Sequence, residues 1–231
     1  YFQINKDESM HDAVQRESKN VRENAGILDG STLGKIEIKG EDALEFMNLI
    51  YTNSFTKMKQ GSARYALMLG EDGMVKDDGI ICKISDQHFI ATTTTGGAAT
   101  VLGCMEEYAQ TEWPNLKVFM NSITEQYATF NISGPKTREI MKKAFPNINF
   151  SNEEFPFMTF QFHEFNGIPI RILRASFTGE LGYEIYIPSN SAFKIWEGIQ
   201  SFGKEFGLAP YGTEAMHLLR AEKGYIIVGQ D

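Results

Sequence analysis

Two adjacent carboxylates, Asp77 and Asp78, lie inside the strand-like run Val75–Ile84. Because side chains alternate along a β-strand, the two point to opposite faces of a sheet and cannot share a proton. Asp78 falls on the more apolar face, with Cys82, and is therefore the expected buried carboxylate. A buried charge needs a partner or a ligand, which makes Asp78 a candidate for electrostatic or acid–base chemistry. Two alternatives stay open: an aspartate bonded to nearby backbone N–H groups in a turn, and a β-bulge that exchanges the two faces.

A second candidate is the stretch Phe177–Ile187, which contains two glycines ahead of a carboxylate. Gly179 and Gly182, three residues apart, mark a tight link before a strand. Beyond them, Glu184 and Tyr186 fall on one strand face, so the carboxylate projects beside an aromatic ring. Such a carboxylate can accept two parallel N–H bonds from a planar edge, as a pterin or guanine ring presents. The alternative is the solvated outer face of an antiparallel sheet.

A third candidate is the helical pattern 213–225, where Glu214 and His217 lie three residues apart on one face. No metal-ligand set forms there, and a lone His near an apolar stripe is more often a structural hydrogen-bonder than a base. No Gly-x-Gly-x-x-Gly opens a helix, and no Gly-x-x-x-x-Gly-Lys-Thr occurs. Neither a dinucleotide site nor an ATP site is therefore indicated within the sequence.

The elements that must position these residues alternate between strands and single helices, with hairpin-length links. This order favours an α+β fold with mixed or antiparallel sheets and flanking helices. The apolar spacing predicts helices at 7–22, 41–50, 96–110, 136–144, 191–206 and 213–223, and strands at 35–39, 62–69, 74–84, 88–95, 116–120, 126–132, 157–165, 169–174 and 183–188.

Charge and composition exclude several classes of function. The 231 residues carry 22 basic and 30 acidic side chains, a net charge of −8, without a block of like charge, so we expect no nucleic-acid partner. Cys82 and Cys104 lack ligand-like spacing and are expected to be buried thiols. Without a leader or an apolar run of about eighteen residues, we expect a cytoplasmic protein that binds no membrane. The missing initiator Met and the apolar end Tyr225–Val228 suggest a piece of a longer polypeptide.

The first two candidates resemble motifs of the folate-dependent aminomethyltransferases, typified by the T-protein of the glycine cleavage system. Members of that family carry a Gly-rich turn, two apolar residues and Asp-Asp on a strand, which Asp72–Asp78 matches. They also carry Tyr-Thr-Gly-Glu-x-Gly-x-Glu, which Phe177–Glu184 matches with Phe in place of Tyr. The resemblance covers residues 1–231 and implies a folate-binding region in two discontinuous subdomains, followed in the parent chain by a C-terminal β-barrel.

The resemblance also implies roles toward tetrahydrofolate for four residues. Asp78 is expected beside N5 and N10 of the folate, as the catalytic carboxylate, and Glu184 is expected to hold the amino-pyrimidine edge of the pterin. Phe177 is expected to pack near the pterin, and Tyr65 falls where the family places a folate-contacting Tyr.

The late helix departs from the T-protein pattern, because Ala215–His217 reads Ala-Met-His where T-proteins have Ala-Arg-Asp. The chain more closely resembles the α subunits of heterotetrameric sarcosine oxidases, in the stretches 28–36, 92–99, 110–114 and 219–225. That resemblance implies an enzyme that oxidises sarcosine to glycine and transfers the one-carbon unit, as an imine or formaldehyde, to tetrahydrofolate, giving 5,10-methylenetetrahydrofolate. It further implies other subunits as partners, a dinucleotide-binding half that precedes this region, and FAD, FMN and NAD bound outside it.

Two other functions remain open. One is a T-protein-like aminomethyltransferase or a related demethylase that acts on another donor. The other is a folate-binding module without turnover, as in a related regulator of iron–sulfur cluster assembly. That regulator is recognised by a Lys-Gly-Cys-Tyr stretch, whose Cys is absent from the corresponding Lys223–Tyr225.

Overall fold

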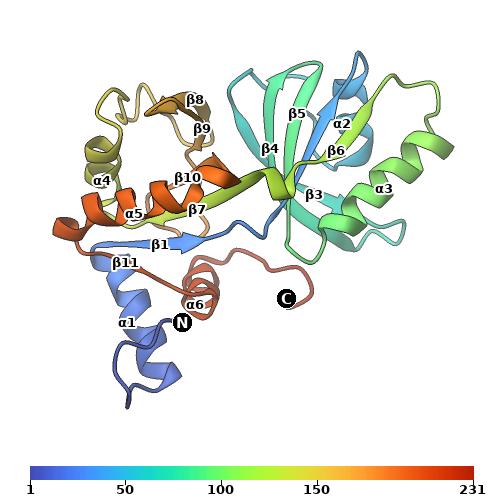
Figure 1. Cartoon of the computed structure of the whole chain (residues 1–231). Coiled ribbons are helices and arrows are strands. Elements are labelled where there is room, and N and C mark those ends of the chain that lie inside the picture. The colour runs from blue at the N-terminus through green and yellow to red at the C-terminus, as the bar shows by residue number, and fades with distance from the viewer. The chain divides into compact units, whose positions relative to one another are not determined.

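The computed structural model describes residues 1–231 and divides into two compact units (Figure 1). Unit 1 comprises residues 1–30 and 128–227, and unit 2 comprises residues 31–127 and 228–231. Each unit contains one β-sheet with helices packed against it. The α+β class with mixed and antiparallel sheets is thus confirmed.

The sheet of unit 2 has five strands in the order β3-β4-β5-β2-β6, and every pairing in it is antiparallel. Two helices pack on the sheet and, with it, form one apolar core. In chain order the elements are β2 (Gly34–Lys39), α2 (Ala43–Ile50), β3 (Ala63–Leu69), β4 (Val75–Ser85), β5 (His88–Thr93), α3 (Ala98–Thr111) and β6 (Phe119–Ser122), followed by the 3-10 turn η1 (Thr124–Gln126).

The sheet of unit 1 has six strands in the order β11-β1-β7-β10-β9-β8. It is mixed, because β1 pairs with β11 in parallel and with β7 antiparallel. Its elements are α1 (Met10–Glu23), β1 (Ala25–Asp29), β7 (Tyr127–Ser133), α4 (Thr137–Ala144), β8 (Phe160–Phe165), β9 (Ile168–Leu173), β10 (Gly182–Pro188), η2 (Ser189–Ser191), α5 (Ala192–Gly203), η3 (Lys204–Phe206), β11 (Leu208–Pro210) and α6 (Thr213–Lys223).

Helices cover both faces of the sheet of unit 1. Ile27 of β1 belongs to a core that includes residues of α4 and α5, whereas its neighbour Leu28 packs on a cluster from α1 and α6. Because successive strand residues point to opposite faces, the two helix pairs lie on opposite sides of the sheet. The strands β10 and β9 therefore present one face to the apolar core and a second face that carries Glu184.

All six predicted helices and nine predicted strands are present, with shifts of a few residues at most ends. Two strands were missed. Asn24 and Gly26 follow the predicted helix 7–22 and are residues typical of a helix end, so no strand is expected there from the sequence. The structure nevertheless continues as β1 at Ala25–Asp29, where a Cβ on Gly26 would overlap the ring of Tyr211. The other missed strand, Leu208–Pro210, has three residues and depends on pairing with β1. Pairing of this kind depends on tertiary structure, so the spacing of apolar residues within the segment does not predict it.

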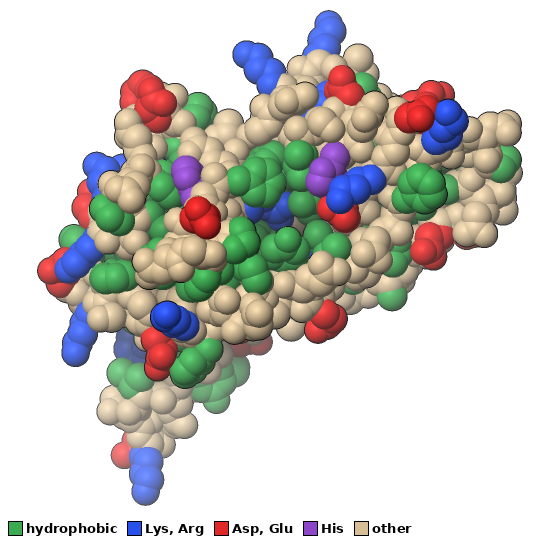
Figure 2. Space-filling model, turned by 45° about the horizontal axis from the view of Figure 1, so that its top comes forward, with side chains coloured by type: hydrophobic (Ala, Val, Ile, Leu, Met, Phe, Trp, Pro, Cys, Tyr) green, Lys and Arg blue, Asp and Glu red, His purple; other side chains and the backbone are tan.

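None of the helices is long and apolar enough to cross a membrane. On the face drawn in Figure 2, acidic and basic side chains are interspersed with apolar ones. Cys82 and Cys104 are buried, as the sequence predicts.

Candidate functional site

The carboxylate of Asp78 is held by a tyrosine on the neighbouring strand. The hydroxyl of Tyr65, on β3, donates to Oδ2 of Asp78, on β4, at 2.8 Å. Tyr65 is 44% exposed, whereas Asp78 is half-buried. Unit 2 thus brings together two of the four residues predicted to contact folate, with the aromatic ring at the surface beside the carboxylate.

The more deeply buried carboxylate is Asp77, at 3% exposure, so the prediction that Asp78 is the buried one is wrong. Asp77 shares its face with Ile81, which lies in the core, and with buried Lys83. Because Asp77 and Lys83 are both charged, the sequence pattern of this face is less apolar than that of the face with Asp78, although this is the face that points to the core. The backbone N–H of Thr94 donates to the carboxylate of Asp77 at 3.2 Å, and Lys83 pairs with Asp86 at 2.6 Å, so both buried charges have local partners.

Both carboxylates of β4 have raised pKa values. Burial is the main cause of the raised pKa of Asp77. Burial also raises the pKa of Asp78; the hydrogen bond from Tyr65 lowers it, and the charge of Asp77 raises it again. The pKa of the Tyr65 hydroxyl rises through burial and through its bond to Asp78, so this tyrosine remains a proton donor at neutral pH. The arrangement can stabilise a nearby positive charge and exchange a proton.

Glu184 lies on β10 beside an aromatic ring, as the alternation of side chains predicts. The hydroxyl of Tyr186 donates to Oε2 of Glu184 at 2.6 Å. Tyr186 is 1% exposed and Glu184 is half-buried, so the carboxylate does not lie on the solvated outer face that was the alternative. An ionised carboxylate accepts on both oxygens and can therefore bond to a ligand as well as to Tyr186.

A buried polar cluster lies near Glu184 in the same unit. The hydroxyl groups of Tyr211 and Ser133 both donate to Oδ1 of Asn131, at 3.2 and 2.6 Å. Burial raises the pKa of Tyr211, the hydrogen bond with Ser133 opposes the rise, and the charge of Glu184 adds to it. The negative charge of Glu184 therefore acts on the hydroxyl of Tyr211 in this cluster.

Phe177 opens the turn that leads into β10. It is half-buried, and its ring stacks on that of Tyr225 with centroids 6.0 Å apart. Arg22 of α1 ties this turn down by donating to the carbonyl of Thr178 at 2.6 Å and to Glu180 at 3.0 Å. The turn is thereby fixed to helix α1.

Glu214 and His217 of the late helix join no metal site, because no group of three or more His, Cys, Asp or Glu side chains converges anywhere in the chain. Arg171, a buried arginine beside Tyr186, is a further residue of this region that is not among the candidates predicted from the sequence. The signal was present in the sequence, because Arg171 is the one charged residue in the apolar strand β9.

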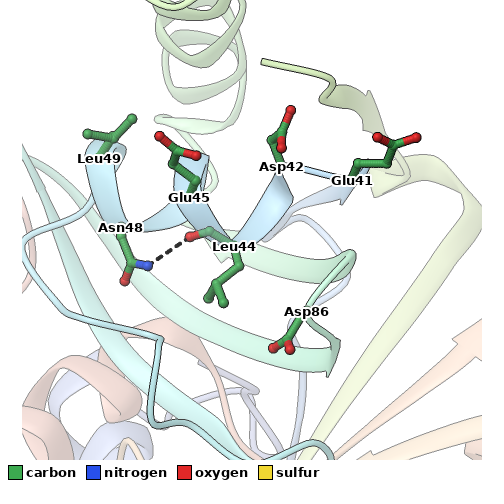
Figure 3. A pocket seen from close by; sticks show the side chains of 7 residues that line it. All are labelled: Glu41, Asp42, Leu44, Glu45, Asn48, Leu49 and Asp86. Atoms are coloured by element: carbon green, nitrogen blue, oxygen red, sulfur yellow. Dashed lines mark hydrogen bonds between the residues drawn. The ribbon is translucent and has the colours of Figure 1, made fainter.

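A hollow of about 410 Å³ lies on another part of unit 2, beside helix α2 (Figure 3). The amide of Asn48 there donates to the carbonyl of Leu44 at 2.9 Å. Lys117 pairs with Glu41, and Lys83 with Asp86, so two of its four carboxylates already have cationic partners. None of the residues predicted to contact folate lines this hollow, which comprises Glu41, Asp42, Leu44, Glu45, Asn48, Leu49 and Asp86.

Related proteins place the chain in a family. The α subunits of sarcosine oxidase from Corynebacterium sp. (strain U-96) and Rhizobium meliloti (strain 1021) are 52% and 42% identical to it, over 97% and 98% of this chain. The chain spans 23% of the length of each of these relatives. An aminomethyltransferase of Chlorobium phaeovibrioides is 32% identical over 96% of this chain and 59% of its own length.

Solved structures share the fold. Aminomethyltransferase T of the glycine cleavage system from Bartonella henselae aligns with a TM-score of 0.81 at 23% identity, over 93% of this chain and 55% of that one. A chain of the heterotetrameric sarcosine oxidase from Corynebacterium sp. U-96 aligns with a TM-score of 0.57 at 12% identity, over 91% of this chain and all of that one. A family model described as the GCVT N-terminal domain matches residues 1–231. The chain belongs to the GCVT N-terminal domain family.

Proposed function

We propose that this chain is the tetrahydrofolate-binding region of a sarcosine oxidase α subunit. In this proposal the whole enzyme oxidises sarcosine to glycine, and this region transfers the released carbon to tetrahydrofolate as 5,10-methylenetetrahydrofolate. The identity of 52% to a sarcosine oxidase α subunit supports the choice of enzyme. The carboxylate of Asp78, half-buried and held by Tyr65, is the observation that carries the proposal.

The residues present fit a pterin in two respects. The half-buried carboxylate of Glu184, fixed by Tyr186, suits a planar edge with two N–H donors. The ring of Tyr65, exposed beside Asp78, offers an aromatic surface next to a negative charge. Tetrahydrofolate, when bound, supplies N5 and N10 as the nucleophiles for the one-carbon unit.

The roles of the residues follow from their chemistry. Asp78 stabilises positive charge that develops near it and takes part in proton transfer, and burial raises its pKa above the ordinary value of a carboxyl. Tyr65 holds Asp78, and its hydrogen bond favours the ionised form of that carboxylate. Phe177 packs near the pterin. Oxidation of the amine is assigned to flavin and NAD sites outside this chain and to the other subunits of the complex.

Binding of tetrahydrofolate tests the proposal. In the intact protein, Glu184→Gln should weaken binding about tenfold, because a neutral amide accepts N–H bonds less strongly than a carboxylate does. Glu164→Gln, at an exposed position on β8, is the matched control and should leave the affinity unchanged. Equal affinities of the wild type and Glu184→Gln in calorimetry would contradict the assignment of the pterin edge to Glu184.

Aminomethyltransferase activity is the second candidate, favoured by the 32% identity to an aminomethyltransferase. The proteins that copurify with the intact protein distinguish a sarcosine oxidase from an aminomethyltransferase. Flavin-bearing subunits support the oxidase, whereas a lipoyl carrier protein supports an aminomethyltransferase.

A further inference from the structure

Arg171 is a buried cation in the middle of an apolar strand. Arg171 lies on β9 and is 6% exposed, and the Nε atom of its side chain has no hydrogen-bond partner. No carboxylate lies within ion-pair distance of it. Burying a guanidinium is unfavourable unless another interaction compensates, so the position of Arg171 calls for a specific contact.

That contact is the ring of Tyr186. Arg171 and Tyr186 are paired directly across β9 and β10, and residues so paired share a face of the sheet. The Cζ atom of Arg171 lies 4.0 Å from the centroid of the Tyr186 ring, which is cation–π geometry. Since Tyr186 donates to Glu184 at 2.6 Å, the three side chains form a row from β9 to β10.

We infer that Arg171 is a positioning residue that prepares Glu184 for ligands with an amino-pyrimidine edge, an inference that rests on the proposed function. The guanidinium on the ring face fixes the ring and draws electron density from it, which strengthens the phenol as a donor. The short, charge-assisted bond then fixes the plane of the Glu184 carboxylate. A carboxylate with a fixed plane can accept from two N–H donors at once. Because the Glu184 side chain is already ordered, binding does not carry the entropic cost of immobilising it.

The expected consequence is selectivity for the exocyclic amino group of the ligand. Only a ligand with two adjacent N–H donors gains from a fixed carboxylate plane. The test therefore compares tetrahydrofolate with its 2-desamino analogue, which lacks that amino group. Both are titrated by calorimetry into the intact protein that carries this chain.

Arg171→Met should weaken tetrahydrofolate binding about five- to tenfold and binding of the 2-desamino analogue less than about twofold. Tyr186→Phe, which keeps the ring and removes the hydroxyl, should likewise weaken binding of tetrahydrofolate more than binding of the 2-desamino analogue. This variant provides the test if Arg171→Met does not fold. Arg171→Lys should restore part of the affinity, because it returns the charge without the planar group. Arg138→Met, which removes a half-buried arginine bonded to Asn152 in the same unit, should change neither affinity.

A double-mutant cycle separates positioning from a general structural effect. In a Glu184→Gln background, Arg171→Met should weaken binding less than about twofold further. Equal losses for both ligands, or an undiminished loss in the Glu184→Gln background, would overturn the inference. If Glu184→Gln weakens binding while the Arg171 and Tyr186 variants do not, the inference fails and the proposed function stands. If the wild type binds no tetrahydrofolate, the proposed function itself fails.

Discussion

Tyr65 donates its hydroxyl hydrogen to Oδ2 of Asp78 at 2.8 Å, from the adjacent strand. Tyr65 is paired across the sheet with Ile80, and Asp78 with Leu67, so the two interacting residues are diagonal neighbours on one face. A long aromatic side chain spans that diagonal. The bond opposes the rise in the pKa of Asp78 that burial causes, so the tyrosine favours the ionised carboxylate.

Tyr65→Phe should therefore raise the pKa of Asp78. The acidic limb of the pH profile of methylene transfer should move to higher pH, because more of the carboxyl is protonated at a given pH. The fold should be retained, since Tyr65 is 44% exposed. A profile measured from pH 5 to 8 whose acidic limb does not move would show that this bond does not control Asp78.

The raised pKa of Asp77 should make stability depend on pH. Between the ordinary value of 3.8 and the higher folded value, the native state binds more protons at Asp77 than the unfolded state does. Stability contributed by this group is therefore lost as the pH rises through that window. Asp77→Asn removes the titration, so the variant should gain stability relative to the wild type from pH 4 to 7 in urea unfolding. Asp72→Asn, on an exposed turn, is the control, and its unfolding free energy should depend on pH as that of the wild type does. A difference in unfolding free energy between Asp77→Asn and the wild type that stays the same from pH 4 to 7 would contradict the prediction.

Gly79, next to Asp78 on β4, should not accept a side chain. A Cβ there would overlap the carbonyl oxygen of Thr92 on the paired strand, whereas a Cβ on Gly96 meets nothing within 4 Å. Gly79→Ala should lower the free energy of unfolding by about 2 to 3 kcal/mol, because the strands must separate to make room. Gly96→Ala should change it by less than about 0.5 kcal/mol. Similar midpoints for the two variants in denaturant would contradict the close strand approach.

Arg22 should stabilise the turn that carries Phe177. Its guanidinium donates to the carbonyls of Thr178 and Leu219 and pairs with Glu180 and Glu222. Arg22→Met should cost about 2 kcal/mol of unfolding free energy, because buried acceptors lose a charged donor.

The control for Arg22 is Lys19→Met on the same helix. Lys19 is 73% exposed and pairs with Glu23 at 3.9 Å, so its loss should cost less than about 0.5 kcal/mol. Equal stabilities of the two variants would show that Arg22 does not anchor the turn.

The sequence predicts most of the elements, because their hydrophobic periodicity is strong and local. It also predicts that Glu184 and Tyr186 share a strand face. The side of β4 that faces the core could not be predicted, because Lys83 and Asp77 are charged residues whose partners, Asp86 and Thr94, come from neighbouring turns and strands. The diagonal bond between Tyr65 and Asp78 likewise depends on strand register, which the two isolated strand patterns do not specify.

The row formed by Arg171, Tyr186 and Glu184 shows the same limit. Tyr186 and Glu184 are two residues apart, so alternation finds them, but Arg171 reaches Tyr186 only through the pairing of β9 with β10. A lone arginine in an apolar strand indicates that something must compensate its charge. It does not indicate which ring.

The role proposed for Asp78 predicts that its loss uncouples methylene transfer from amine oxidation. In the intact protein, the yield of 5,10-methylenetetrahydrofolate per sarcosine oxidised is measured for the wild type, for Asp78→Ala and for Glu71→Ala, a control on the exposed turn before β4. All three proteins should oxidise sarcosine at similar rates, whereas Asp78→Ala alone should lose the folate-linked yield, by at least about a hundredfold, and release formaldehyde instead. An unchanged yield of methylenetetrahydrofolate from Asp78→Ala would show that Asp78 has no part in methylene transfer.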